Sequence, residues 1–213
     1  MESKLLQKLV NKTLTKQQLL EKVKQNYELI PEILDGISSS KPAIRYSCGK
    51  VLMDLSEEEP EKLYAHMDFF IKMLESKYRI LTWNAIITIA NLTKVDSKKK
   101  FDSIFDRYYS FLDDEYMVTV ANVVGNSGKI ALSKPYLTQK ITDKLLKVEN
   151  ISITPHLSEE CKRVITQHTI KTFDSFFPQI EEKDKVISFV KKQLNSKRET
   201  LRTESENFLK RWG

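Results

Sequence analysis

The feature that most constrains the fold is a helical pattern that returns at a nearly constant interval. Apolar and small residues follow helical spacing at Ile44, Cys48, Val51, Leu52 and Leu55. The segment 81–92 repeats this pattern 37 residues later, and a segment that begins at Leu201 repeats it 157 residues after Ile44, close to four periods. Repetition at this interval predicts units of two helices that stack and bury their apolar sides against one another.

Helix starts carry the same chemistry at several places. Capping boxes, in which a Ser or Thr is followed three residues later by Glu or Gln, are predicted at Thr15/Gln18, Ser56/Glu59 and Ser196/Glu199. Prolines that suit a first helical turn are Pro42, Pro60, Pro135 and Pro155. Only 5 glycines and 6 prolines occur in 213 residues, too few for the tight turns of many short strands. These observations predict an all-α protein.

The segment Pro42-x-Ile44-Arg45-x-x-Cys48-x-x-Val51-Leu52-x-x-Leu55 resembles the second half of a HEAT repeat. The similarity extends over most of residues 26–212. The resemblance implies an α-α superhelix, a HEAT-like or armadillo-type solenoid of about five helix pairs. It also implies that the second helices form an inner face, which such proteins commonly use for protein or nucleic-acid contacts.

We expect one repeat domain over 1–213. Residues 1–25 are predicted to form N-terminal capping helices, 26–182 the central repeats, and 183–213 a C-terminal capping repeat. The net charge of +6 is uneven, with +4 in 1–24, −3 in 25–182 and +5 in 183–213. A nucleic-acid binder that uses its whole surface should be basic in the middle as well, so this distribution favours a protein partner.

Location and chemistry are constrained by what the sequence lacks. The N-terminal residues do not have the unbroken apolar stretch of a signal peptide, and no segment is long and apolar enough to span a bilayer. Cys48 and Cys161 are far apart and show no metal-binding spacing, which favours a reducing, cytoplasmic location without membrane contact. No cofactor or metal is expected.

The candidate partner-binding residues are Arg45, Trp83, Asn84, Asn91, Asn122 and Asn126. The segment from Ile87 to Leu92 is similar to the armadillo segment whose asparagine, here Asn91, holds an extended peptide backbone through its amide. Ile87 stands where armadillo repeats have a tryptophan. Asn122 and Asn126 are expected to extend this row. In the alternative interpretation, these asparagines end helices or form hydrogen bonds within the core.

The candidate anion-binding residues are Lys191, Lys192, Arg198 and Arg202. A phosphate-rich partner would bind such a cluster. The alternative is that these side chains only solvate the outer face of a terminal repeat.

No sequence motif for catalysis is found, neither a P-loop, H-E-x-x-H, G-x-S-x-G nor a Gly-rich dinucleotide turn. The sequence therefore predicts a non-catalytic scaffold or adaptor that binds a protein or peptide. The alternative is nucleic-acid binding, including a role like that of the HEAT-like alkylpurine DNA glycosylases. Those enzymes use paired tryptophans and an aspartate, whereas Trp83 and Trp212 lack such an aspartate.

Overall fold

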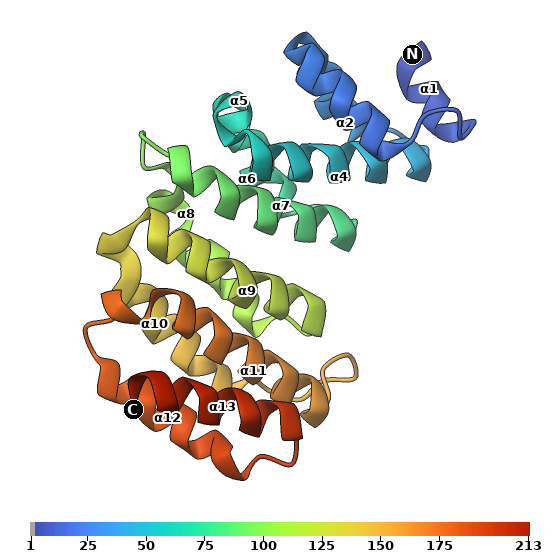
Figure 1. Ribbon diagram of the computed structural model, residues 1–213. Helices are drawn as coiled ribbons and strands as arrows, with labels where there is room; N and C mark the ends of the chain where they lie inside the picture. The colour runs from blue at the N-terminus through green and yellow to red at the C-terminus, as the bar shows by residue number, and fades with distance from the viewer. Residues whose placement is uncertain (1–2) are drawn as a thin grey trace. The chain divides into compact units, whose positions relative to one another are not determined.

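A computed structural model describes residues 3–213, so the first two residues of the predicted segment 1–25 lie outside it. Most of the described chain is helical and no strand is formed within it (Figure 1), which confirms the expected all-α class. The α-helices are α1 (Lys4–Val10), α2 (Lys16–Gln25), α3 (Ile30–Gly36), α4 (Pro42–Glu58), α5 (Pro60–Leu63), α6 (Met67–Met73), α7 (Arg79–Leu92), α8 (Lys100–Ser110), α9 (Met117–Ser133), α10 (Thr138–Leu146), α11 (Glu159–Phe176), α12 (Lys183–Lys191) and α13 (Glu199–Trp212).

Short 3-10 segments connect or extend several of these helices. They are η1 (Tyr27–Leu29), η2 (Tyr64–His66), η3 (Thr93–Val95), η4 (Phe111–Asp113), η5 (Pro135–Leu137), η6 (Lys147–Asn150), η7 (Phe177–Gln179) and η8 (Lys192–Asn195). No helix among residues 3–213 is long and apolar enough to cross a membrane.

The chain divides into two compact units, of which the first runs to Lys100 and the second comprises Phe101–Gly213. In the first unit, α4 packs between α2 and α7, and α6 packs on α7 (Figure 1). In the second unit, α11 packs between α9 and α13, with α10 against α9 and α12 against α13. Each unit is therefore a row of second helices backed by first helices. The predicted three-part division of the chain remains a prediction.

The helix α7 shows why the repeat pattern becomes a buried stripe. It contacts both α4 and α6, so apolar residues are needed on several of its sides, and Leu81, Ala85, Ile86 and Ile89 are all buried. The outward side of α7 is narrow and includes Ile80, which is 42% exposed.

Aromatic side chains dominate the core contributed by α8. Phe101 and Tyr108 are fully buried and their ring centroids lie 5.3 Å apart, while Phe105 and Tyr109 lie 4.7 Å apart. Burial of each such ring stabilises the fold by about 2–3 kcal/mol. The spacing of these residues along α8 places them on one face, which is the face that packs inward.

Four second helices begin after the same kind of turn. A side-chain oxygen in the turn accepts a hydrogen bond from the backbone N–H two residues later. These pairs are Ser39/Lys41, Ser76/Tyr78, Asp114/Tyr116 and Ser196/Arg198. Ser and Asp favour such local hydrogen bonds, and the recurrence of this turn marks the repeat.

Some predicted helix starts are correct and others are wrong. The capping box of Thr15 and Gln18 is confirmed. Ser56 is no cap, because α4 continues to Glu58 and the Ser56 hydroxyl donates to the Met53 carbonyl at 2.6 Å. Ser196 is no cap either, since it belongs to the recurring turn before α13.

The prolines divide in the same way. Pro42 and Pro60 occupy first helical turns as predicted, and Pro135 begins the 3-10 segment η5. Pro155 does not start a helix. It lies in a turn enclosed by an isolated antiparallel bridge between Thr154 and Leu157, and α11 begins later, capped by Ser158.

Candidate partner-binding surface

Arg45 lies inside the first unit and is only 5% exposed. Its guanidinium packs over the rings of Tyr46 and Tyr78, at 4.8 and 3.8 Å from the ring centroids. Its Nη1 donates to the Ser39 carbonyl at 2.8 Å, and its Nε is buried without a hydrogen-bond partner in the described chain. Arg45 therefore contacts both the turn before α4, through Ser39, and the residue that precedes α7, Tyr78.

Trp83 lies half-buried on the outward side of α7, between Ile80 and Ile87. The corresponding residue of α4, 37 positions earlier, is Tyr46, which is also half-buried. Because α4 and α7 pack side by side, the two second helices of the first unit present aromatic residues at corresponding positions. Aromatic side chains are enriched where protein partners bind.

The first unit contains two of the predicted asparagines, Asn84 and Asn91. Of these two, Asn84 has an amide that makes no hydrogen bond within residues 3–213. It is nevertheless only 8% exposed. A methyl group at Gly49 would lie 2.7 Å from Asn84 Nδ2, so the glycine in α4 makes room for this amide.

Asn91 is differently placed. Its Nδ2 donates to the Ser56 hydroxyl at 3.0 Å, and both groups are buried. This bond joins α7 to α4, which agrees with the alternative interpretation of a hydrogen bond within the core. A role of Asn91 in binding remains a prediction.

In the second unit, Asn122 and Asn126 lie half-buried on α9. Asn126 Nδ2 donates to the Asn122 carbonyl at 2.8 Å, one turn back along the helix. Asn122 is the sixth residue of α9, as Asn84 is of α7. The predicted continuation of the row onto α9 remains a prediction.

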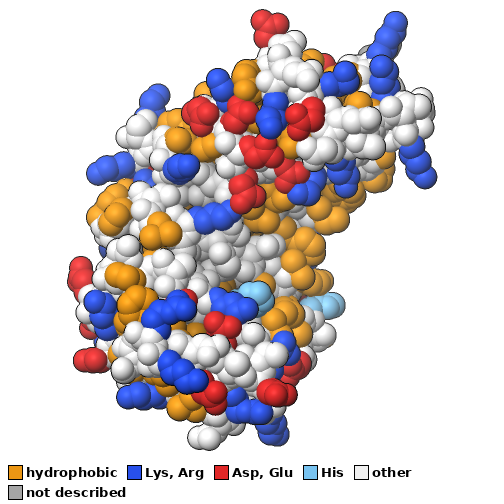
Figure 2. Space-filling model, viewed as in Figure 1, with side chains coloured by type: hydrophobic (Ala, Val, Ile, Leu, Met, Phe, Trp, Pro, Cys, Tyr) orange, Lys and Arg blue, Asp and Glu red, His pale blue; other side chains and the backbone are white. Residues whose placement is uncertain are grey.

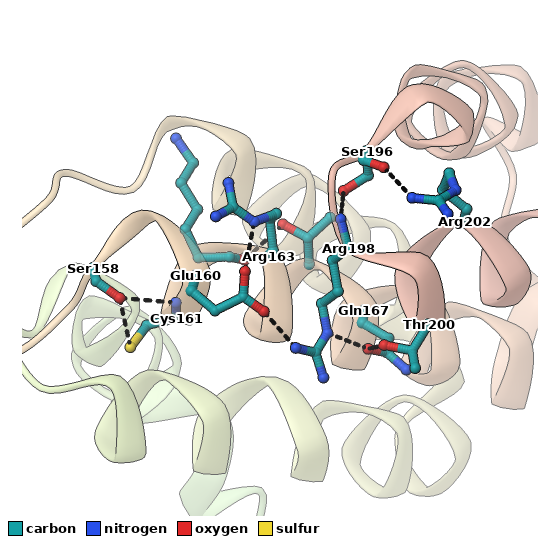
Figure 3. Close-up of polar contacts among 11 residues, drawn as sticks. Ser158, Glu160, Cys161, Arg163, Gln167, Ser196, Arg198, Thr200 and Arg202 are labelled. Carbon is teal, nitrogen blue, oxygen red and sulfur yellow. Dashed lines mark hydrogen bonds and ion pairs between the residues drawn. The ribbon is translucent and has the colours of Figure 1, made fainter.

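The predicted anion-binding arginines take part in contacts within the second unit (Figure 3). Arg198 forms an ion pair with Glu160 and donates from Nε to Gln167 at 3.0 Å. Arg202 donates from Nη1 to the Ser196 carbonyl at 2.7 Å. Hydrogen bonds from Arg163 and then Arg198 hold the pKa of Glu160 below its usual value. The contacts of Arg198 join α11 to the start of α13, whereas the contact of Arg202 closes the turn before α13.

The two predicted lysines differ from each other. Lys192 is paired with Glu149 at 2.8 Å between Nζ and Oε2, whereas Lys191 is exposed at the end of α12. The structure thus does not gather the four basic residues into one unpaired cluster. An anion-binding role for them remains a prediction.

No group of three or more His, Cys, Asp or Glu side chains suited to a metal ion occurs within residues 3–213. Cys48 is fully buried, and burial raises the pKa of its thiol to about 12. Cys161 is half-buried near the start of α11, where its sulfur lies 3.2 Å from the Ser158 hydroxyl.

No protein-family model and no curated protein matches the sequence. Among solved structures, a designed armadillo repeat protein has a TM-score of 0.64 at 16% identity, with 98% of this chain and 92% of that chain covered. A second designed armadillo repeat protein, in complex with the peptide (KR)4, has a TM-score of 0.62 at 13% identity, with 98% and 91% covered. An engineered protein has a TM-score of 0.54 at 12% identity, with 90% and 83% covered. The chain therefore has an armadillo/HEAT-like helical repeat fold.

Proposed function

We propose that the chain is a cytoplasmic, non-catalytic scaffold that binds an extended segment of another protein on its second helices. The observation that carries this proposal is Asn84, a residue that is only 8% exposed and whose amide makes no hydrogen bond within residues 3–213. A carboxamide offers one acceptor and two donors, which match the N–H and C=O of an extended peptide backbone. Binding of such a backbone would supply the missing hydrogen bonds.

A second group at the corresponding position supports the same surface. Ser47 is the sixth residue of α4, as Asn84 is of α7, and it is 7% exposed. Its hydroxyl likewise makes no hydrogen bond within the described chain. Two neighbouring helices thus offer polar groups 37 residues apart in sequence, at the interval of the repeat.

Trp83 and Tyr46 would supply apolar contact area beside these polar groups. Large aromatic side chains lose little conformational entropy when a partner covers them, and they commonly dominate binding energy. The complex of a designed armadillo repeat protein with a (KR)4 peptide supports a peptide as the kind of partner for this fold.

The charge distribution supports a protein partner rather than nucleic acid. Figure 2 shows acidic and basic side chains intermixed over the first unit, with acidic ones gathered near the junction of α4 and α5. A continuous basic surface, which phosphate backbones require, is not what this face presents. We therefore expect peptide binding with weak salt dependence.

The test uses Trp83 fluorescence. The other tryptophan, Trp212, donates from Nε1 to Asp174 Oδ1 at 2.7 Å in the second unit. The variant Trp212→Phe leaves Trp83 as the one tryptophan of the chain. A combinatorial library of ten-residue peptides is screened for binding, and the best binder is titrated. We expect a change in Trp83 emission and a loss of affinity of about tenfold in Asn84→Ala.

Asn150→Ala serves as the control, because Asn150 is an exposed asparagine of the second unit. The proposal is wrong if no library peptide binds, or if Asn84→Ala binds as tightly as the control. Titration of a generic DNA duplex at two salt concentrations tests the alternative. Duplex binding that falls steeply with salt would favour nucleic acid instead.

A further inference from the structure

A groove of about 580 Å³ opens in the first unit where the turns before α4 and α7 meet α6. Its floor is apolar and includes Ile37, Phe69, Met73 and Leu81. This volume lies within the range of sites that bind a few side chains or a small ligand. The groove lies at the N-terminal ends of α4 and α7, and Asn84 does not line it.

The charged groups around this groove are of one sign. Lys72 and Lys77 line it, and no acidic residue does. Lys72 has no ion pair within the described chain, and the Lys77 ammonium contacts only the ring of Tyr78, 5.2 Å from its centroid. Two half-buried lysines of the first unit do form ion pairs, Lys24 with Glu58 and Lys100 with Asp68.

A third cation lies behind the wall of the groove. The buried Arg45 guanidinium stacks on Tyr78 and donates to the Ser39 carbonyl, and both Tyr78 and Ser39 line the groove. No carboxylate pairs with Arg45 in residues 3–213. A buried cation without a counter-ion leaves positive potential at the neighbouring surface, and the N-terminal ends of α4 and α7 add to it.

Backbone donors complete the site. Ser40 and Lys77 are the middle residues of two successive turns of the recurring kind, and both line the groove. Neither backbone N–H has an acceptor within the described chain. The groove therefore combines an apolar floor with ammonium and N–H donors, and it offers no negative charge to match them.

We propose that this groove binds an acidic peptide segment of another protein, in which a bulky apolar side chain is flanked by Asp or Glu. The apolar side chain would cover Phe69 and Met73, and the flanking carboxylates would pair with Lys72 and Lys77 and accept from the free N–H groups. Charge complementarity argues for this occupant, since a basic peptide would face three cations.

The probe is the fluorescein-labelled peptide EEDLFDEE, measured by anisotropy with the whole chain. Two matched peptides, KKKLFKKK and EEDSSDEE, reverse the charge and remove the apolar pair. We expect EEDLFDEE to bind at least about tenfold more tightly than either. The double substitution Lys72→Glu with Lys77→Glu should weaken it by at least about tenfold. Lys140→Glu with Lys147→Glu, two exposed lysines of the second unit, makes the same charge change and should leave binding unchanged.

The position of the bound peptide can be measured on the wild-type chain, without a substitution in the groove. The chain has five methionines, and Met73 alone lines the groove, so its labelled ε-methyl NMR signal should shift on addition of EEDLFDEE. The signal of Met117, in α9, should not shift. The proposal is overturned if Met73 is unperturbed, if the reversed peptide binds equally, or if the Lys72/Lys77 variant binds normally.

Two further measurements distinguish a peptide site from a simple anion site and from the proposed scaffold surface. Inorganic phosphate at the same charge concentration should not displace the peptide. Displacement by phosphate would show a simple anion site and overturn the peptide proposal. Asn84→Ala should retain binding of EEDLFDEE, so this site can fail or succeed independently of the proposed scaffold surface.

Discussion

Two pairs of neighbouring second helices, α4/α7 in the first unit and α11/α13 in the second, are joined by different kinds of polar contact. In the first unit, α4 and α7 are linked by an uncharged hydrogen bond from Asn91 to Ser56 and by the close approach at Gly49. In the second unit, charged and amide side chains link α11 to α13, with Glu160 and Gln167 both bound to Arg198. The polar groups at the α11/α13 contact therefore bind one another. The Asn84 amide beside the α4/α7 contact makes no hydrogen bond within residues 3–213.

Two arginines at corresponding positions make this difference specific. Arg45 and Arg202 are 157 residues apart, and each donates from Nη1 to the carbonyl six residues earlier. Arg45 is buried between two tyrosine rings, whereas Arg202 is half-buried. The same backbone contact therefore occurs in two environments, and burial decides how much each arginine stabilises its unit.

The largest expected effect is that of removing Arg45. Arg45→Ala should lower the free energy of unfolding by about 3 kcal/mol, because it loses a charge-assisted hydrogen bond and two desolvated ring contacts. Arg202→Ala should lower it by about 1 kcal/mol, because that bond is closer to water. Urea denaturation of both variants measures the difference. Equal losses would mean that burial does not distinguish the two units.

A smaller contrast is expected between two helical glycines. Gly49→Ala should lower the free energy of unfolding by about 1–2 kcal/mol, since the new methyl group would lie 2.7 Å from Asn84 and 2.9 Å from Leu81. Gly125→Ala, in α9, should raise it by about 0.5–1 kcal/mol, because the methyl group meets no atom within 4 Å and alanine favours helix. Thermal unfolding checks both signs. A stabilising Gly49→Ala would contradict the close approach of α4 and α7.

The smallest effect concerns acid. The pKa of Glu160 is lowered in the folded chain by Arg163 and then by Arg198. Its contribution to stability is therefore complete above the ordinary Glu pKa of about 4.3 and is lost as pH falls through the lower folded value. The wild type should have a higher free energy of unfolding than Glu160→Gln at pH 6, and urea denaturation should show this difference disappear between pH 6 and pH 3.

The matched control is Glu159→Gln, at the neighbouring exposed position in the same helical turn. Its difference from wild type should change less over this range. Stability differences that are the same for both variants at every pH would show that the ion pair with Arg198 does not hold α11 and α13 together.

The repeat could be predicted because the apolar residues of each repeat have the same spacing along the sequence. The helix α7, the capping box at Thr15 and the first-turn prolines Pro42 and Pro60 follow from local chemistry. The wrong cap at Ser56 arose because a Ser-x-x-Glu pattern also fits the end of a helix. Only the packing of α4 shows that the helix continues to Glu58.

The candidate surface was less accessible to sequence reasoning. Asn84 and Asn91 look alike in the sequence, and they differ because Ser56, 35 residues earlier, lies within reach of Asn91 alone. The groove was missed because its walls come from two repeats and from α6. A signal was nevertheless present. Ser39-x-Lys41 and Ser76-x-Tyr78 recur 37 residues apart, and their spacing identifies both turns.

The recurring turn has a consequence for how such a chain can grow. Each of these joints is closed by its own residues, a side-chain oxygen and an N–H two positions later. A duplicated gene segment would therefore encode its own turn. Only the apolar faces of its helices would have to pack against new helices. This architecture can thus be lengthened by tandem duplication of a repeat. The exposed positions of the copies can diverge afterwards.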